Sequence, residues 1–193
     1  MMTALPLLSL LLALAAPDEG CPLHKQHTAA PAAAALAAAA AAPASGPYAG
    51  EEMREIKALS PADLKAYDEG AGMGMAKPAE LNQYPGPRHL LDSAEALKLS
   101  EAQRAAIDAS YQKMRAEAVP LGRQVIEVER RLDALFAKRE ASAEAVDDLT
   151  RASAELQGRL RALHLRAHVE VRGLLTPEQI VQYVALRGYG HQH

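Results

Sequence analysis

Large aromatic side chains are scarce in this 193-residue chain. Aromatic residues make up 4% of it, Phe136 is the only phenylalanine, and there is no tryptophan. Because such rings supply much of the volume of a thick core, the core must be built from smaller aliphatic side chains. Few stretches are rich in the β-branched residues typical of strands. The composition therefore favours an all-α protein with seams of leucine, valine and alanine.

Cysteine is also scarce, and neither sign of charge dominates. Cys21 is the only cysteine, so no disulfide can form within the chain, and the redox compartment cannot be read from it. The formal net charge is −3, which supports neither nucleic-acid binding nor an acidic interaction tail. We therefore expect no nucleic-acid partner.

The first residues have the pattern of a secretion signal. An apolar run of leucine and alanine covers residues 5–16, and residues 13–15 (Ala-Leu-Ala) fit the small-x-small cleavage pattern. The run is too short to span a bilayer comfortably, so no transmembrane span is expected in the mature chain. We predict a signal peptide at residues 1–15 and export to the periplasm.

Residues 16–47 are low in complexity and consist largely of alanine interrupted by proline. They have no polar face that would orient a helix, so we predict a linker. Residues 42–44 (Ala-Pro-Ala) are an alternative cleavage site, which leaves the start of the mature chain open.

Residues 48–98 are predicted to form short helices and loops. Ser60 is a suitable N-cap, Pro61 suits the first helical position, and the helix should end near Gly70. A rigid turn rich in proline and glycine at residues 84–87 should precede one or two further helical turns.

Two heptad patterns dominate residues 99–190. Apolar or small residues recur at alternating steps of three and four along residues 107–135 and again along residues 146–174. If the chain reverses near Glu140, both seams fit one register in which Val125 faces Leu156. We therefore predict a long antiparallel helical hairpin domain with short flanking helices.

Three residues on this hairpin predict details of its shape. Pro120 removes one helical hydrogen bond and should bend the first helix. Gly122 and Gly158 fall in nearly the same layer of the register, where they would let the two backbones approach closely. A bent hairpin would present a curved surface.

A short pattern, L-[ST]-x-x-Q, occurs twice, at residues 99–103 and 175–179. The hydroxyl caps the first turn of a helix, and the glutamine reaches back to the N–H of the capping residue, forming a capping box. Antiparallel helices would bring the two boxes to the same end of the hairpin. The residues of this motif are Leu99, Ser100, Gln103, Leu175, Thr176 and Gln179.

Two such boxes around a helical hairpin behind a signal peptide resemble the Spy/CpxP (LTxxQ-motif) family of periplasmic stress chaperones and heavy-metal sensor or resistance proteins. The resemblance covers residues 99–189, and the first box departs from it by carrying Ser100 instead of threonine. It implies a thin, curved homodimer that binds unfolded clients without ATP on a surface of apolar and basic residues. The candidate basic residues, interleaved with glutamates as on any solvated helix, are Arg115, Arg123, Arg130, Arg131, Arg159, Arg161, Arg166 and Arg172.

The resemblance leaves a second function open, a metal-binding sensor or buffer that acts on a signalling partner in the membrane. His164 and His168 share one helix face and could chelate zinc, copper or nickel. The register places Glu117 beside His164 as a third ligand. However, the positions of the family's sensor ligands fall on Ala167 and Val171 here, which do not bind metal. Ordinary histidines that stack or form hydrogen bonds are the alternative.

Other soft ligands lie outside the hairpin. Cys21, His24 and His27 form C-x-x-H-x-x-H in the linker, where thiolate and imidazole suit Cu⁺ or Zn²⁺. Cleavage at the later site would remove them. Met73 and Met75 offer thioether sulfur, although such residues more often pack in loops.

No pattern in the chain indicates an enzyme. The glycine-rich residues 70–74 superficially resemble a phosphate loop, but no strand precedes them and no Lys-Ser/Thr follows in register. We predict a non-enzymatic protein.

Overall fold

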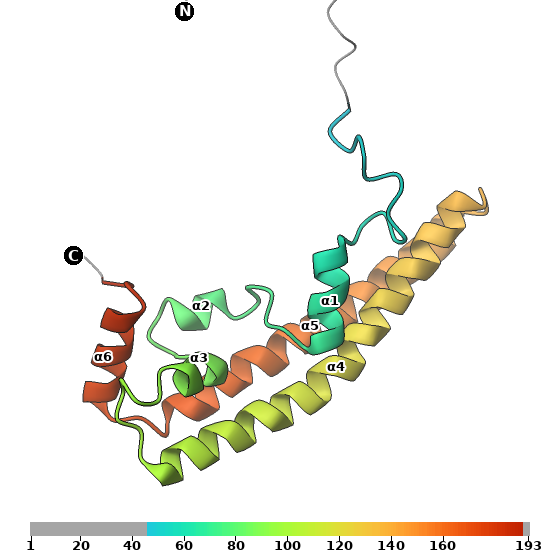
Figure 1. The fold of residues 1–193 in the computed structure, drawn as a ribbon. Helices are drawn as coiled ribbons and strands as arrows, with labels where there is room; N and C mark the ends of the chain where they lie inside the picture. Colours follow the sequence, from blue (N-terminus) through green and yellow to red (C-terminus); the bar gives the residue numbers. More distant parts are fainter. Residues whose placement is uncertain (1–45, 191–193) are drawn as a thin grey trace, which may run out of the picture. The chain divides into compact units, whose positions relative to one another are not determined.

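The structure is a computed structural model that describes residues 46–190. Every regular element in this part of the chain is a helix, which confirms the predicted all-α class (Figure 1). The predicted signal peptide and the Cys21, His24 and His27 cluster lie outside the described residues. The helices are α1 (Pro61–Glu69), α2 (Lys77–Glu80), α3 (Pro87–Asp92), α4 (Glu101–Ala137), α5 (Ala143–Arg172) and α6 (Pro177–Leu186).

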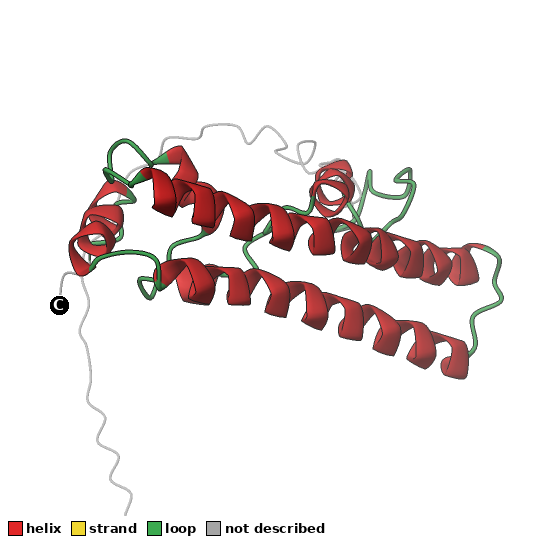
Figure 2. Ribbon diagram, turned by 90° about the horizontal axis from the view of Figure 1, so that it is seen from below, coloured by secondary structure: helices red, strands yellow, loops and turns green. Residues whose placement is uncertain are grey.

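The long helices α4 and α5 form the predicted antiparallel hairpin (Figures 1 and 2). Val125 is fully buried, and Leu156 packs against the same core cluster. The hydroxyl of Ser153 donates a hydrogen bond to Oε1 of Glu129 at 2.6 Å across the two helices. The register predicted from the two seams is therefore confirmed.

Helix α4 runs for 37 residues and continues through Pro120. Proline removes one hydrogen bond of the helix, but its neighbours Ala118 and Leu121 are buried in the core. Packing on both sides of the proline therefore keeps the helix continuous.

The prediction that Gly122 and Gly158 let α4 and α5 approach closely is wrong, because Gly122 faces α1 instead. A Cβ atom at Gly122 would lie 2.3 Å from the carbonyl oxygen of Tyr67, which belongs to α1. Gly158 is exposed, and a Cβ atom there would meet nothing within 4 Å. Gly122 thus makes room for α1 instead of α5, because α1 rests directly on the backbone of α4.

The segment of residues 46–99 packs along the hairpin and shares its core. Ile56, Leu59 and Tyr67 join one cluster of buried side chains with residues of α4 and α5. The predicted helix of this segment is confirmed as α1, with Ser60 in a capping box and Gly70 at its end at φ 69°. The segment is therefore an integral layer of the fold.

A second core cluster closes the other end of the hairpin. It joins α3, α4, α5 and α6 through the buried residues Leu90, Leu97, Leu99, Ile107, Val171 and Tyr183. Both predicted capping boxes are present, at Ser100 and Thr176, and they lie at this same end. Among the helices of residues 46–190, none is long and apolar enough to cross a membrane.

The two boxes also bind each other. The side-chain amide of Gln103 donates to Oε1 of Gln179 at 2.8 Å, and Gln179 donates back to Oε1 of Gln103 at 3.1 Å. Each amide also donates to a backbone carbonyl, Gln103 to Leu174 and Gln179 to Leu97. Each glutamine therefore both completes a helix cap and joins α4 to α6.

Candidate functional site

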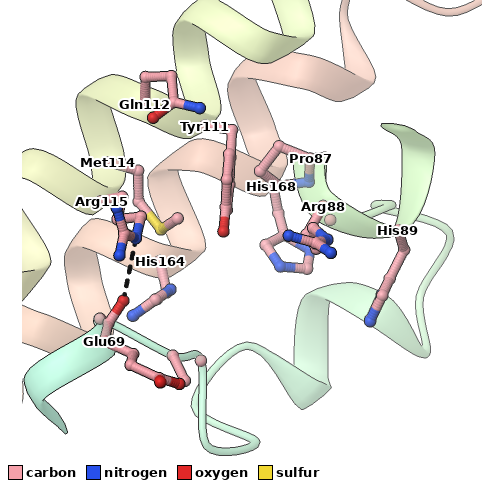
Figure 3. A pocket seen from close by; sticks show the side chains of 14 residues that line it. Glu69, Pro87, Arg88, His89, Tyr111, Gln112, Met114, Arg115, His164 and His168 are labelled. Atoms are coloured by element: carbon pink, nitrogen blue, oxygen red, sulfur yellow. Dashed lines mark hydrogen bonds between the residues drawn. The ribbon is translucent and has the colours of Figure 1, made fainter. Parts of the chain in front are cut away.

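A cavity of about 560 Å³ lies between the hairpin and the segment that covers it (Figure 3). Helix α4 contributes Tyr111, Met114 and Arg115, and α5 contributes His164 and His168. The loop after α1 and the start of α3 form the rest of the wall. The spacing of the two histidines correctly predicted that both would face one side of α5.

His164 is enclosed without a polar partner. His164 is 4% exposed, and its Nε2 atom makes no hydrogen bond within the described chain. Burial, and to a smaller extent the neighbouring His168, lowers the pKa of His164. The ring therefore stays neutral at neutral pH and keeps an unshared lone pair.

His168 is held by the backbone of the segment opposite. Its Nδ1 lies 2.8 Å from the carbonyl oxygen of Tyr84, to which it donates a hydrogen bond. A Cβ atom at Gly86 would lie 3.0 Å from Nε2 of this ring, so the glycine leaves the ring its space. With Nδ1 acting as the donor, the lone pair of a neutral ring is on Nε2.

The prediction that Glu117 lies beside His164 is wrong. Glu117 is exposed and borders a separate hollow, together with Lys113 and Arg166. His164 lines the cavity under the covering segment, whereas Glu117 lines the other hollow, so the two residues do not face one another. Within residues 46–190, no group of three or more His, Cys, Asp or Glu side chains is placed to hold a metal ion.

The two loop methionines also do not line this cavity. Met75 packs against the core between α1 and the hairpin, whereas Met73 is 37% exposed. Met114 is the methionine that borders the cavity. Met114 falls on the apolar seam of residues 107–135, and its place in that heptad pattern gave no sign of a second role.

A buried carboxylate behind the cavity was not predicted. Glu80 of α2 is 8% exposed and accepts hydrogen bonds from the hydroxyl of Tyr183 and from the Gly86 N–H, the latter at 3.1 Å. His89 Nδ1 lies 3.2 Å from Oε1 of Glu80, and Arg187 Nε lies 3.7 Å from the same oxygen. Glu80 therefore ties together α2, α3 and α6.

The surroundings of Glu80 keep it ionised. Burial by itself would raise its pKa, but hydrogen bonds from His89 and Tyr183 and the nearby His89 and His168 outweigh burial and lower the pKa to about 2. The pKa of Tyr183 is raised, first by burial and then by its hydrogen bond to Glu80. No local pattern marks Glu80, because its partners Tyr183 and Arg187 are far away in the chain.

The eight candidate arginines fall into two groups. Arg123 pairs with Asp68 at 2.8 Å, and Arg130 pairs with Glu55 at 3.2 Å. These two and two others hold the covering segment: Arg115, Arg123, Arg130 and Arg172. The remaining four form no ion pair with any described residue: Arg131, Arg159, Arg161 and Arg166.

The side of the hairpin opposite the covering segment is open. Figure 2 shows α4 and α5 side by side with no other described helix in front of them. A hollow of about 170 Å³ on this side is lined by Lys113, Leu163 and Arg166, and also by the carboxylates of Glu117 and Glu170. Arg131 lies five helical turns from Lys113, and Arg159 lies two turns from Arg166, so both belong to the same side. We call this surface, defined by Lys113, Arg131, Arg159, Leu163 and Arg166, the open face.

Comparisons with known proteins agree with the two boxes. No curated protein and no solved structure matches the chain significantly. The model of the LTXXQ motif family protein matches residues 88–187, which is more than half of the 193 residues. The matched region begins in α3, includes both boxes and reaches the end of α6. The chain therefore belongs to the LTXXQ motif family.

Proposed function

We propose that the protein is a non-enzymatic, periplasmic, stress-related chaperone that binds unfolded clients on the open face without ATP. Membership of the LTXXQ motif family supports a role of the chaperone or metal-resistance type. The apolar run at residues 5–16 supports export. As in the resemblance described above, we expect the chaperone to act as a homodimer.

The observation that carries this proposal is the set of unpaired cations on the open face. Lys113, Arg131, Arg159 and Arg166 form no ion pair with described residues, whereas the arginines on the other side are engaged with the covering segment. Long cationic side chains with apolar stems can contact both carboxylates and exposed aliphatic groups. Such a surface favours weak binding of many non-native chains over tight binding of one partner.

The test is suppression of aggregation of a chemically denatured, acidic client without nucleotide. We expect the purified protein to suppress aggregation at near-stoichiometric ratios, and the triple variant Arg131→Gln/Arg159→Gln/Arg166→Gln to lose most of this effect. A matched triple variant, Arg54→Gln/Lys65→Gln/Arg151→Gln, changes the net charge equally at residues that already have carboxylate partners. Equal activity of the two triple variants, or no suppression by the unchanged protein at tenfold excess, would reject the proposal.

A second candidate function is metal binding in a sensor or buffer that acts on a membrane signalling partner. The observation that favours it is the buried pair His164 and His168 at one cavity. Calorimetry with Zn²⁺, Cu²⁺ and Ni²⁺ tests it, with the double variant His164→Ala/His168→Ala as the comparison. Micromolar binding that this variant loses would support metal binding, and the absence of any binding heat would reject it.

A further inference from the structure

We propose that the cavity between α3, α4 and α5 binds a soft monovalent metal ion, Cu⁺, through His164, His168 and Met114. The proposal rests on the second candidate function and specifies its ion and its ligands. Both histidines come from α5, and the methionine comes from α4. The site would therefore bridge the two long helices at the level where the covering segment crosses them.

The first argument is the buried ring of His164. Buried polar atoms in folded proteins nearly always have a hydrogen-bond partner, and an exception calls for a physical reason. Neither ring nitrogen of His164 bonds to another described residue. Nε2 is enclosed, whereas Nδ1 lies on the side of Gly72, which lines the same cavity, so Nδ1 is the nitrogen that can reach an ion there. A neutral imidazole without a partner can donate its lone pair to a metal ion.

The second argument is the way in which His168 is fixed. Histidines that bind metal usually donate their second ring N–H to a carbonyl or carboxylate, which sets the tautomer and the orientation of the ring. The bond of 2.8 Å from Nδ1 of His168 to the Tyr84 carbonyl has this form. Oε2 of Glu80 lies 3.8 Å from the same nitrogen and adds negative charge behind the ring.

The third argument is the sulfur of Met114. This residue is 6% exposed and lines the same cavity from the opposite helix. In Figure 3 the side chains of Met114, His164 and Tyr111 extend toward the same space, whereas His89 lies at its far side. Thioether sulfur is a soft ligand that favours Cu⁺ over Zn²⁺ or Mg²⁺.

Charge also favours a monovalent ion. Imidazole rings and a thioether carry no negative charge that would neutralise a divalent cation. Arg88, Arg115 and Glu69 line the same cavity, and the two guanidinium groups repel a doubly charged ion more strongly than a singly charged one. The three ligands themselves therefore favour a soft ion of low charge.

The experiment uses the full mature chain carrying Cys21→Ser, His24→Gln and His27→Gln, which removes the other soft ligands predicted from the sequence. Silver(I), as the nitrate in chloride-free buffer, is a redox-stable probe for a Cu⁺ site. We expect one equivalent to bind and to shift the NMR signals of the Met114 methyl group and of the His164 and His168 rings. Met114→Leu, which preserves side-chain volume, should weaken Ag⁺ binding by roughly tenfold or more.

The matched control is Met73→Leu, because Met73 lies on a neighbouring loop and does not line the cavity. It should bind Ag⁺ like the unchanged protein, and thermal unfolding should show that both methionine variants fold. The last residues, His191-Gln192-His193, offer two further imidazoles. Signal shifts confined to Met73 or to these two histidines, or unchanged Ag⁺ affinity in Met114→Leu, would overturn the proposal. If divalent ions shift the signals of the two rings but Ag⁺ does not shift the Met114 methyl signal, the proposal of a Cu⁺ site is overturned. The second candidate function is then still supported. If no ion binds, both fail.

Discussion

Glu80 is a buried side chain whose polar contacts reach three distant residues, Tyr183, His168 and Arg187. It is buried, yet its hydrogen bonds to Tyr183 and Gly86 and its contact with His89 keep it ionised. Removing one partner from a buried network leaves the others unsatisfied, which is more costly than losing an exposed ion pair. The effect of Glu80 on stability should therefore be large and should depend on pH.

We expect Glu80→Gln to lower the free energy of unfolding by about 2 kcal/mol at neutral pH. The folded-state pKa of about 2 is below the ordinary value of 4.5, so the stabilisation by Glu80 is complete above pH 4.5 and is lost as the pH falls toward 2. Urea denaturation from pH 7 to pH 2 checks this. Glu95→Gln, at an exposed position, is the control. The expectation is contradicted if the free energy of unfolding of Glu80→Gln falls with decreasing pH as steeply as that of the unchanged protein.

His164 should affect stability in a different range of pH. Its pKa is lowered in the folded state by burial, so the unfolded chain takes up the proton first as the pH falls below 6.5. Folding is therefore most favourable above pH 6.5 and weakens below it. In His164→Leu, the urea midpoint should change less between pH 7 and pH 5 than in the unchanged protein. An identical slope in both proteins would count against a buried, neutral His164.

Among the contacts between helices, the one between α1 and α4 depends on Gly122, which has no side chain. A Cβ atom at Gly122 would lie 2.3 Å from the Tyr67 carbonyl oxygen, a contact that only a backbone shift can relieve. In contrast, Gly158 lies on the exposed side of α5. The same substitution should thus have opposite effects at these two helical glycines.

We expect Gly122→Ala to destabilise the fold by about 1–3 kcal/mol through overpacking, despite the higher helix propensity of alanine. Gly158→Ala should stabilise it by about 0.5–1 kcal/mol, because only the helix propensity changes. Chemical denaturation of both variants measures the difference. A stabilising effect of Gly122→Ala would mean that α1 does not rest on α4 at this point.

The capping boxes are local features of single helices, and they also form tertiary contacts between helices. Each box was predicted from five residues, because the bond between the hydroxyl and the third N–H is local. The reciprocal bonds between Gln103 and Gln179 could not be predicted in the same way. They require α6 to turn back onto α4, and the buried side chains of both helices decide that turn.

For the whole molecule, the covering segment is part of the core of the hairpin. Ile56, Leu59 and Tyr67 pack over apolar residues of α4 and α5 that would otherwise face water. The ion pairs of Arg123 and Arg130 at its edges are exposed and contribute little individually. Apolar burial therefore provides most of the attachment of this segment.

We expect a chain shortened to residues 99–193 to lose cooperative unfolding, because two helices without the covering segment leave Ala118, Leu121 and Val125 partly uncovered. Circular dichroism during heating and in urea measures this. A chain of residues 46–193 is the control and should unfold like the full mature protein, since residues 45–193 form one compact unit. A sharp transition of the shortened chain at the same temperature would show that the hairpin is stable by itself.

The sequence by itself determined the two long helices, their register, the three caps at Ser60, Ser100 and Thr176, and the pairing of His164 with His168 on one side of α5. These features follow from helical periodicity and from bonds between residues close together in the chain. Only the tertiary structure decided that Gly122 receives α1, that Glu117 does not face His164, and that Glu80 is enclosed. The reason is physical: the rotation of each helix about its axis and the position of the covering segment depend on apolar contacts between residues far apart in the chain, which no local pattern encodes.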